Sequence, residues 1–271
     1  MTQETWLGRH PYLRPVADFH LQVALAAASG PISDVCLPQW EGYRKDYQLG
    51  IPLLQSPHIS INLRSAESAV VFLVDDVASW PTPEKWVRES RDLAATLHRE
   101  LDAPQRAVAW LLDSDAFTPE HPGLLRYLGW TALARNLRSL LEAFSDWRDE
   151  ERWLRSYCPA CGSPPAMAQL VGIETGRRRL LYCGCCGTRW RFRRIGCPFC
   201  LKDDAHRLTI LAIEGEKDLR IDYCESCGAY LKTYIGEGNE TFFLADWTSL
   251  HLDLLADDRG LKRPAASLYQ L

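Results

Sequence analysis

The sequence predicts an α+β protein with several domains. We expect an all-helical N-terminal domain over residues 1–150, two small cysteine-rich modules over 151–195 and 196–245, and a C-terminal helix and tail over 246–271. Three observations support this prediction: apolar residues recur at helical spacing before residue 150, nine of the ten cysteines lie between Cys158 and Cys227, and short strand-like segments with glycine turns begin near residues 148–157. A chain of 271 residues is long enough for more than one domain.

Capping residues and apolar faces predict the helical domain. Thr82 can cap a helix, Pro83 suits its first turn, and Glu84 favours the positive end of the helix dipole. Residues 69–77 are rich in β-branched side chains and fit either a strand or a buried helix. Proline- and glycine-rich breaks suggest five to seven helices. The expected apolar faces are Trp86, Leu93, Leu97 and Leu101 in one segment, and Leu133, Leu137, Leu140, Leu141 and Phe144 in another.

The cysteines form four Cys-x-x-Cys pairs. Two such pairs about 15–20 residues apart are the sequence form of a tetrahedral four-thiolate metal site. Here 21 residues separate Cys161 from Cys183, and 23 separate Cys200 from Cys224. The sequence therefore predicts two such sites, with the ligands Cys158, Cys161, Cys183, Cys186, Cys197, Cys200, Cys224 and Cys227.

The two modules have the pattern of an internal duplication. The first runs from CPAC to LLYCGCCGTRW, and the second from CPFC to IDYCESCGAYL. The duplication favours grouping neighbouring pairs, but a crossed grouping of first with third and second with fourth is also open. Glycine follows three of the pairs and permits the positive φ that turns backbone N–H groups toward the sulfurs. Leu201 follows the other pair, so we expect that turn to have a different shape.

Four thiolates per metal make a closed coordination sphere. A catalytic metal usually keeps an open position, so we expect structural or electron-transfer sites. Tetrahedral sulfur suits either zinc or iron, and the spacing does not distinguish them. The expected cofactors are thus two metal ions, which would hold together modules too small to have a core of their own. Cys185 is interpreted as a replaceable surface residue rather than a reactive thiol.

Positive charge is concentrated in the cysteine-rich region. The net charge is −4, which does not suggest general nucleic-acid binding, yet residues 151–200 hold nine arginines against two glutamates. Arg189, Arg191 and Arg193 alternate with Trp190 and Phe192, as in an amphipathic strand with the rings inward and the arginines in water. The same three arginines are candidate contacts for an anionic partner.

The sequence contains no recognisable export signal, membrane span or catalytic motif. Asp18 and His20 interrupt the only apolar run near the N-terminus, and no stretch reaches the length of a membrane span. Clustered cysteines in a reducing compartment are more often metal ligands than disulfides, so we expect a cytoplasmic protein. No residues suggest a nucleophile with its base and orienting group, so we expect no enzyme activity.

The cysteine-rich region resembles the formate dehydrogenase accessory protein FdhE family. The resemblance is carried by YCPACGSPP, LLYCGCCGTRW, CPFC, ESCGAYLKTY and LADWTSLHLDLLADDRGLKR, in this order, and by GIPLLQS at 50–56. It covers nearly the whole C-terminal region and continues more weakly over the rest. It implies an all-helical N-terminal domain followed by two small rubredoxin-like (zinc-ribbon-like) four-cysteine metal modules.

The resemblance also implies a function. Members of this family are not known as catalysts; they help mature respiratory formate dehydrogenases by binding the catalytic subunit in the cytoplasm before the twin-arginine pathway exports it. They are reported to bind iron through their Cys-x-x-Cys cysteines, which here are the eight named above. Asp246, in the ADWTSL block, becomes a candidate partner contact, and Cys185 lies outside the family pattern.

Two other functions fit the same residues. Rubredoxin-like iron could transfer electrons or report the redox state of a partner. A zinc ribbon with arginines and aromatic rings could bind nucleic acid by stacking bases, although the overall acidity and the C-terminal block argue against it. The partner that we expect is therefore a formate dehydrogenase catalytic subunit, with no nucleic acid and no stable membrane insertion.

Overall fold

The computed structural model describes residues 2–32, 36–81, 84–173 and 176–267. By the contacts between Cα atoms, these residues form two compact units. The first unit contains residues 2–17, 47–52 and those described from 149 to 267. The second contains those described within 18–46 and 53–148. The domain limits expected from the sequence are not tested by this division and stay a prediction.

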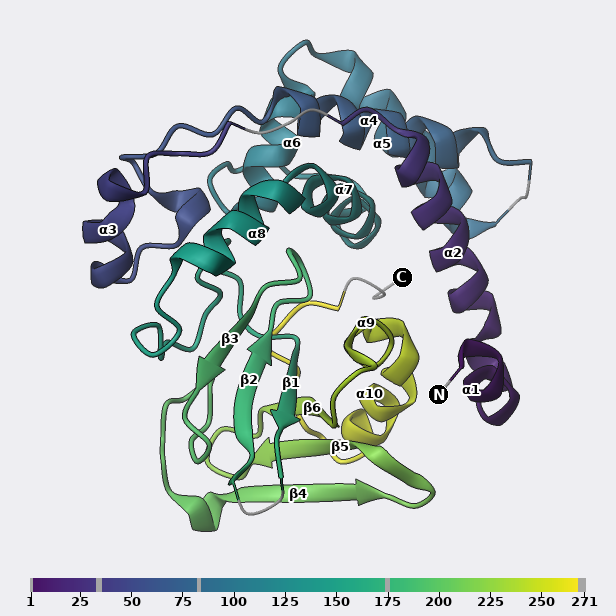
Figure 1. The fold of residues 1–271 in the computed structure, drawn as a ribbon. Helices are drawn as coiled ribbons and strands as arrows, with labels where there is room; N and C mark the ends of the chain where they lie inside the picture. Colours follow the sequence, from purple (N-terminus) through teal and green to yellow (C-terminus); the bar gives the residue numbers. More distant parts are fainter. Residues whose placement is uncertain (1, 33–35, 82–83, 174–175, 268–271) are drawn as a thin grey trace. The chain divides into compact units, whose positions relative to one another are not determined.

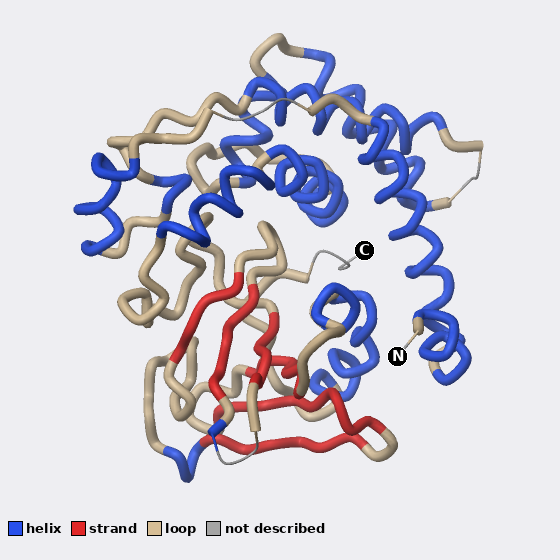
Figure 2. The backbone as a smooth tube through the Cα atoms, viewed as in Figure 1, coloured by secondary structure: helices blue, strands red, loops and turns tan. Residues whose placement is uncertain are grey.

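Helices account for the regular structure before residue 150, and strands begin after it (Figure 2). In the second unit, α4 packs against α5, α6 and α7. The described residues before 150 hold eight α-helices, so the expected number of five to seven was wrong. No described helix is long and apolar enough to cross a membrane. The helices are α1 (Gln3–Arg9), α2 (Arg14–Ser29), α3 (Trp40–Leu49), α4 (Arg64–Ser79), α5 (Lys85–Arg99), α6 (Ala103–Leu111), α7 (Pro122–Asn136) and α8 (Arg138–Trp147).

The ambiguous segment 69–77 is part of helix α4. Its buried residues Val70, Leu73, Val74 and Val77 recur at helical spacing. They are buried because α4 has helices packed around it, so its β-branched residues reflect a buried environment rather than a strand. The hydroxyl of Ser90 in α5 donates to the carbonyl of Val74 at 2.8 Å.

Two details of the predicted helices need correction. Helix α5 begins at Lys85, with Glu84 as its N-cap; Thr82 and Pro83 lie outside the described residues. Leu101 follows the end of this helix and is fully exposed, so it does not belong to the apolar face. The second apolar face is shared by two helices, because α7 ends at Asn136 and α8 begins at Arg138, with Leu137 between them.

A six-stranded sheet forms the centre of the first unit (Figure 1). The strand order is β3-β2-β1-β6-β5-β4. Each module contributes three antiparallel strands, and the two sets join through the parallel pair β1–β6. The first strand of one module therefore pairs with the last strand of the other. The strands are β1 (Met167–Val171), β2 (Arg178–Tyr182), β3 (Arg189–Phe192), β4 (Leu208–Ile213), β5 (Glu216–Cys224) and β6 (Tyr230–Ile235).

The C-terminal segment packs on this sheet. It contains α9 (Glu240–Phe243), a 3-10 turn at Asp246–Ser249 and α10 (Leu250–Asp257). Phe243 of α9 stacks on Tyr234 of β6, with ring centroids 4.8 Å apart. Trp6 of α1 joins the same cluster and donates its indole N–H to the carbonyl of Thr248 at 3.1 Å. The predicted fold class, a helical region with a sheet domain and two four-cysteine modules, is confirmed.

Candidate metal centres

The first cysteine cluster lies beside strands β1 to β3. Cys158 and Cys161 precede β1, and Cys183 and Cys186 lie between β2 and β3. The sulfurs of Cys158 and Cys186 are 3.5 Å apart, and those of Cys161 and Cys183 are 3.4 Å apart. All four side chains are buried.

The second cluster occupies the equivalent place beside β4 to β6. The sulfurs of Cys197 and Cys227 are 3.7 Å apart, and those of Cys200 and Cys224 are 3.8 Å apart. Within each cluster the four sulfurs all lie within 4.8 Å of one another. Metal–sulfur bonds of about 2.3 Å in a tetrahedron put sulfurs roughly 3.8 Å apart, whereas a disulfide needs about 2.05 Å. Each cluster could hold a metal ion, and neighbouring pairs, not crossed pairs, come together.

The four Cys-x-x-Cys turns share one backbone geometry. In each, the N–H of the first cysteine donates to a carbonyl five residues later, at 2.8–2.9 Å. The N–H of the residue after the second cysteine donates to the carbonyl of the first, at 2.8–3.1 Å. That residue has a positive φ in all four turns: 83° at Gly162, 74° at Gly187, 62° at Leu201 and 70° at Gly228.

The expectation that the turn at Leu201 has a different shape was wrong. Leu201 adopts the left-handed conformation that glycine adopts in the other three turns. The two hydrogen bonds and the convergence of the sulfurs require this conformation whatever residue is present, so leucine takes it at some cost in strain. Its side chain is 55% exposed, which means that packing does not offset the strain.

The two clusters differ in exposure. The first is buried throughout, whereas Cys200 and Cys227 of the second are partly exposed. Hydrogen bonding from the backbone of Lys202 lowers the pKa of Cys200 to about 7, and burial raises that of Cys197 to about 12. Cys200 therefore gives up its proton more readily than Cys197, and a bound cation would favour the thiolate form of both.

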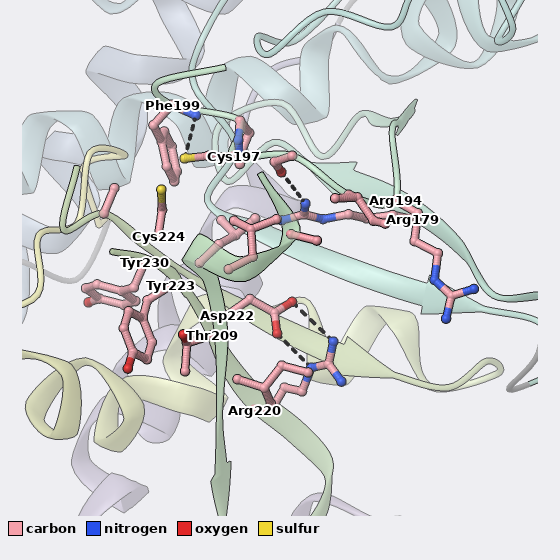
Figure 3. Close-up of a pocket in the computed structure, with 18 of the residues that line it drawn as sticks. Arg179, Arg194, Cys197, Phe199, Thr209, Arg220, Asp222, Tyr223, Cys224 and Tyr230 are labelled. Carbon is pink, nitrogen blue, oxygen red and sulfur yellow. Dashed lines mark hydrogen bonds and ion pairs between the residues drawn. The ribbon is translucent and has the colours of Figure 1, made fainter. Parts of the chain in front are cut away.

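A cavity of about 350 Å³ adjoins the second cluster, with Cys197 and Cys224 in its wall (Figure 3). The buried Arg179 donates to the carbonyl of Gly196 at 2.9 Å, and its Nε has no hydrogen-bond partner among the described residues. Arg220 pairs with Asp222 at 2.8 Å at the side of the cavity. Further lining residues are Arg177, Arg194, Leu170, Ile195, Phe199, Ile210 and Leu231. The cavity thus combines apolar walls with an excess of positive charge.

The arginine strand has the predicted alternation. In β3, Trp190 and Phe192 are buried, Arg189 is exposed and Arg191 is partly exposed. Each of the three arginines has an acidic neighbour. Arg189 lies 3.8 Å from Glu240, Arg191 pairs with Glu151, and Arg193 lies 3.9 Å from Asp203.

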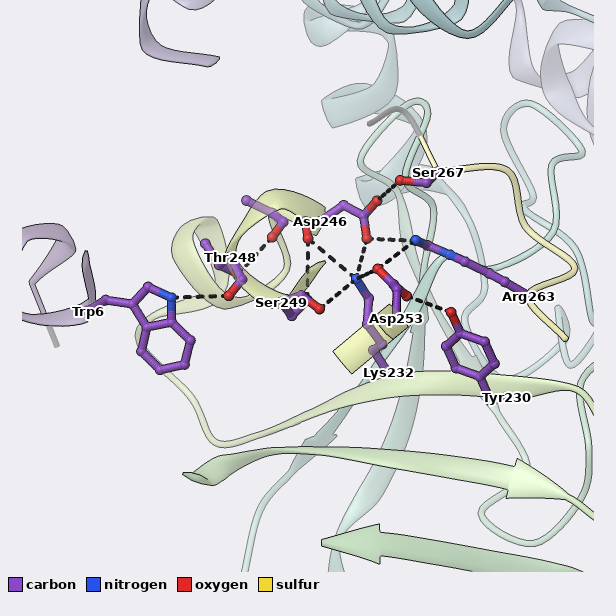
Figure 4. A network of polar contacts seen from close by, with 10 residues as sticks. Trp6, Tyr230, Lys232, Asp246, Thr248, Ser249, Asp253, Arg263 and Ser267 are labelled. Atoms are coloured by element: carbon purple, nitrogen blue, oxygen red, sulfur yellow. Dashed lines mark hydrogen bonds and ion pairs between the residues drawn. The ribbon is translucent and has the colours of Figure 1, made fainter. Parts of the chain in front are cut away.

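Asp246 lies in a buried network around Lys232 (Figure 4). The Nζ of Lys232 is 2.6 Å from Asp246 and 2.8 Å from Asp253, and Arg263 contacts the same two carboxylates at 2.6 and 3.0 Å. Ser267 donates to the second oxygen of Asp246 at 2.6 Å. Burial alone would raise the pKa of Asp246, but Lys232 and Arg263 outweigh it and hold that pKa well below its usual range.

This network accounts for three charged residues of the C-terminal block that carries the family resemblance. Asp246 and Asp253 converge on one lysine of strand β6, and Arg263 pairs with the same two carboxylates, so together they fasten the tail to the sheet. The sequence pattern points to Asp246 but not to Lys232. Lys232 lies within the family block ESCGAYLKTY, and it is also a cation inside the apolar run of YLKTYI, a position that in a buried strand calls for a charged partner.

Together these features define a protein with a helical unit and a sheet unit that bears two closed four-cysteine modules. No family model matches the sequence. A protein named FdhE homolog from Pseudomonas aeruginosa is 33% identical over 274 residues, which cover 94% of this chain and 83% of that protein. The chain belongs to the FdhE family, as its resemblance to these formate dehydrogenase accessory proteins implied.

Other relatives agree with this assignment. An FdhE homolog from Aquifex aeolicus is 32% identical over 130 residues, which cover 46% of each protein. The crystal structure of the FdhE protein from Pseudomonas aeruginosa superposes with a TM-score of 0.60 at 26% identity, and the match covers 95% of this chain and 88% of that one.

Proposed function

We propose that this protein is a non-catalytic accessory protein that binds the catalytic subunit of a respiratory formate dehydrogenase in the cytoplasm before export. The eight cysteines bind two metal ions, iron or zinc, and the metals lock the two modules into a rigid docking platform. The observation that carries this proposal is the pair of closed four-sulfur clusters in a chain of the FdhE family. Four protein ligands leave no open position for a substrate, so the metals hold structure instead of doing chemistry.

The docking surface that we propose lies on the sheet unit. Arg189 and Arg193 are exposed on the edge strand β3 and beside it, and their acidic neighbours are 3.8 and 3.9 Å away. Exposed ion pairs at such distances contribute little, so an acidic partner can replace them. The arginine-lined cavity beside the second cluster can receive an acidic or aromatic side chain of the same partner. Asp246 serves this surface indirectly, by fastening the tail.

The first experiment is recovery of the tagged protein from its own host, grown on formate, followed by protein mass spectrometry and metal analysis of the same eluate. A stoichiometric formate dehydrogenase catalytic subunit is the expected result. Metal-loaded protein that carries no such subunit would contradict the proposal.

Reversing the charge of the exposed arginines tests the proposed docking surface. The double variant Arg189→Glu and Arg193→Glu should bind the catalytic subunit more weakly, because the positive charges of the two arginines speed association with an acidic partner. The affinity of this variant should also depend less on salt concentration. Arg138→Glu, an exposed arginine at the start of α8, is the matched control and should leave the complex unchanged. Equal affinity of the double variant and the control would exclude β3 from the interface.

A second function, electron transfer, is favoured by the partial exposure of the second cluster. Iron held there would lie close enough to the surface to exchange electrons with a partner. Purified protein from its host would then show a reversible one-electron signal. Colourless, zinc-filled protein would eliminate this function and leave the docking proposal standing.

A further inference from the structure

Three side chains from distant parts of the sheet unit meet outside the cysteine clusters. His10 ends helix α1, Glu216 begins strand β5, and His251 lies in α10. One ligand-type atom of each lies within 4.8 Å of the other two. We propose that His10, Glu216 and His251 form a third metal site, which takes a divalent cation of the zinc type.

The distances suit such an ion. Oε1 of Glu216 lies 2.6 Å from Nε2 of His251 and 3.6 Å from Nε2 of His10. Bonds of about 2.0–2.2 Å from zinc to nitrogen and oxygen place tetrahedral ligand atoms roughly 3.3–3.5 Å apart. The two distances lie on either side of this spacing. A cation bound between Glu216 and His251 places the one proton of the neutral His251 ring on Nδ1, and Oε1 of Glu216 and Nε2 of His251 then move apart to the tetrahedral spacing.

Burial leaves a carboxylate oxygen that a cation would satisfy. The side chains of Glu216, His251 and His10 are 7%, 10% and 11% exposed. Oε2 of Glu216 and Nδ1 of His251 have no hydrogen-bond partner within the described part of the chain. A bound cation interacts with both carboxylate oxygens of Glu216, Oε2 as well as Oε1. It also fixes the tautomer of His251, because a ring that binds metal through Nε2 keeps its proton on Nδ1.

Tyr12 orients the ring of His10. Nδ1 of His10 lies 2.8 Å from the hydroxyl of Tyr12, which leaves Nε2 to face Glu216. Metal-binding histidines commonly use their second nitrogen in this way. The rings of His10 and His251 are stacked with centroids 4.7 Å apart, and the ring of Trp6 lies 4.2 Å from that of His10. These rings shield the site from water on one side.

A cavity borders one ligand of the site, Glu216. A cavity of about 250 Å³, lined by Trp6, Arg9 and residues 215–219, includes Glu216 in its wall. Three protein ligands and an adjacent cavity leave a coordination position for water, unlike the closed cysteine clusters. Arg9 lies over the ring of Trp6 at 5.1 Å and adds positive charge nearby, so we expect this site to bind more weakly than four thiolates.

A titration with Co²⁺ distinguishes this site from the two cysteine clusters. The purified full-length protein, with both cysteine clusters filled, is titrated with Co²⁺ alone. We expect one further equivalent, with weak visible bands and no sulfur-to-cobalt charge-transfer band, because its ligands are nitrogen and oxygen. The melting temperature should rise with the same saturation. Failure to bind a third equivalent would overturn the proposal and leave a metal-free His–Glu–His hydrogen-bond group.

Variants test the ligands. Glu216→Gln and His251→Gln should weaken cobalt binding by more than about 100-fold, and Tyr12→Phe by about 10-fold, since outer partners typically contribute 10–100-fold. His98→Gln, which removes an exposed histidine 3.0 Å from Asp75, is the control and should bind as the wild type does. Retention of both thiolate-bound metals shows that each variant is folded. If Glu216→Gln does not retain both thiolate-bound metals, the proposal is tested by the number of cobalt ions that the wild type binds and by the cobalt affinity of Tyr12→Phe. Unchanged binding by folded Glu216→Gln would refute the assignment.

Discussion

The Nζ of Lys232 lies 2.6 Å from Oδ1 of Asp246, and no part of the Lys232 side chain is exposed. One lysine of the sheet thus anchors the segment that follows it. Removing one member of such a pair leaves an uncompensated buried charge, which costs more than the pair itself contributes.

Replacing Lys232 by methionine should therefore lower the free energy of unfolding by about 3–5 kcal/mol. Asp246 and Asp253 would be left to share Arg263. Urea unfolding of the metal-loaded protein, followed by tryptophan fluorescence, measures the loss. The control is Lys85→Met, which removes an exposed lysine 3.5 Å from Glu89 and should cost no more than about 0.5 kcal/mol. Equal losses in both variants would show that the network contributes little.

The same network predicts a pH dependence. Burial opposes the charge on Asp246, but Lys232 and Arg263 hold its folded pKa well below the usual value. A depressed folded pKa stabilises the protein above the unfolded pKa of about 3.9, and the stabilisation is lost as pH falls below it. The difference in unfolding free energy between wild type and Asp246→Asn should stay constant from pH 8 to 5 and shrink only below about pH 4. A difference that already declines between pH 7 and 5 would point to another titrating group.

The turn at Leu201 predicts a stabilising substitution. Leu201→Gly removes left-handed strain worth roughly 1–2 kcal/mol but adds freedom to the unfolded chain, so the net gain should be up to about 1 kcal/mol. Gly228→Ala should cost about 1 kcal/mol, because φ is 70° there while an added Cβ meets no atom of the described residues within 4 Å. Urea unfolding at constant metal measures both changes. A loss of stability in Leu201→Gly would mean that the leucine side chain contributes packing instead of strain.

Removing the cysteines of one cluster should release one of the two metals and leave the other bound. The double variant Cys158→Ala and Cys161→Ala is expected to lose one metal ion while the helical unit stays folded, because its helices pack on one another. Metal analysis together with far-ultraviolet circular dichroism measures this. Cys185→Ala, which changes the partly exposed cysteine beside two proposed ligands, is the control and should keep both metals. Two metals in the double variant would disprove the ligand assignment.

The difference in exposure predicts an order of metal release. A chelator should remove the metal of the second cluster first, because Cys200 and Cys227 are partly exposed while the first cluster is buried. Time-resolved metal release by wild type and by variants that lack the cysteines of one cluster or the other assigns each phase. A single phase with one rate would show that exposure does not control access.

Local signals predicted much of this protein. The Cys-x-x-Cys pairs, the alternation of Arg189 with Trp190, and the apolar faces of the helices each depend on residues a few positions apart. Backbone geometry converts such spacing directly into structure. The members of the two cysteine clusters could therefore be named, and the fold class followed from the change of pattern near residue 150.

The features that only the tertiary structure decided are contacts between residues far apart in the chain. The sequence does not show that β1 pairs with β6, that Lys232 meets Asp246 and Asp253, or that His10 reaches Glu216 and His251. These contacts form only once strands and helices pack, because no short-range spacing encodes them. Leu201 lies between the two cases: the local sequence suggested a different turn, but four converging sulfurs and two backbone hydrogen bonds imposed the same one.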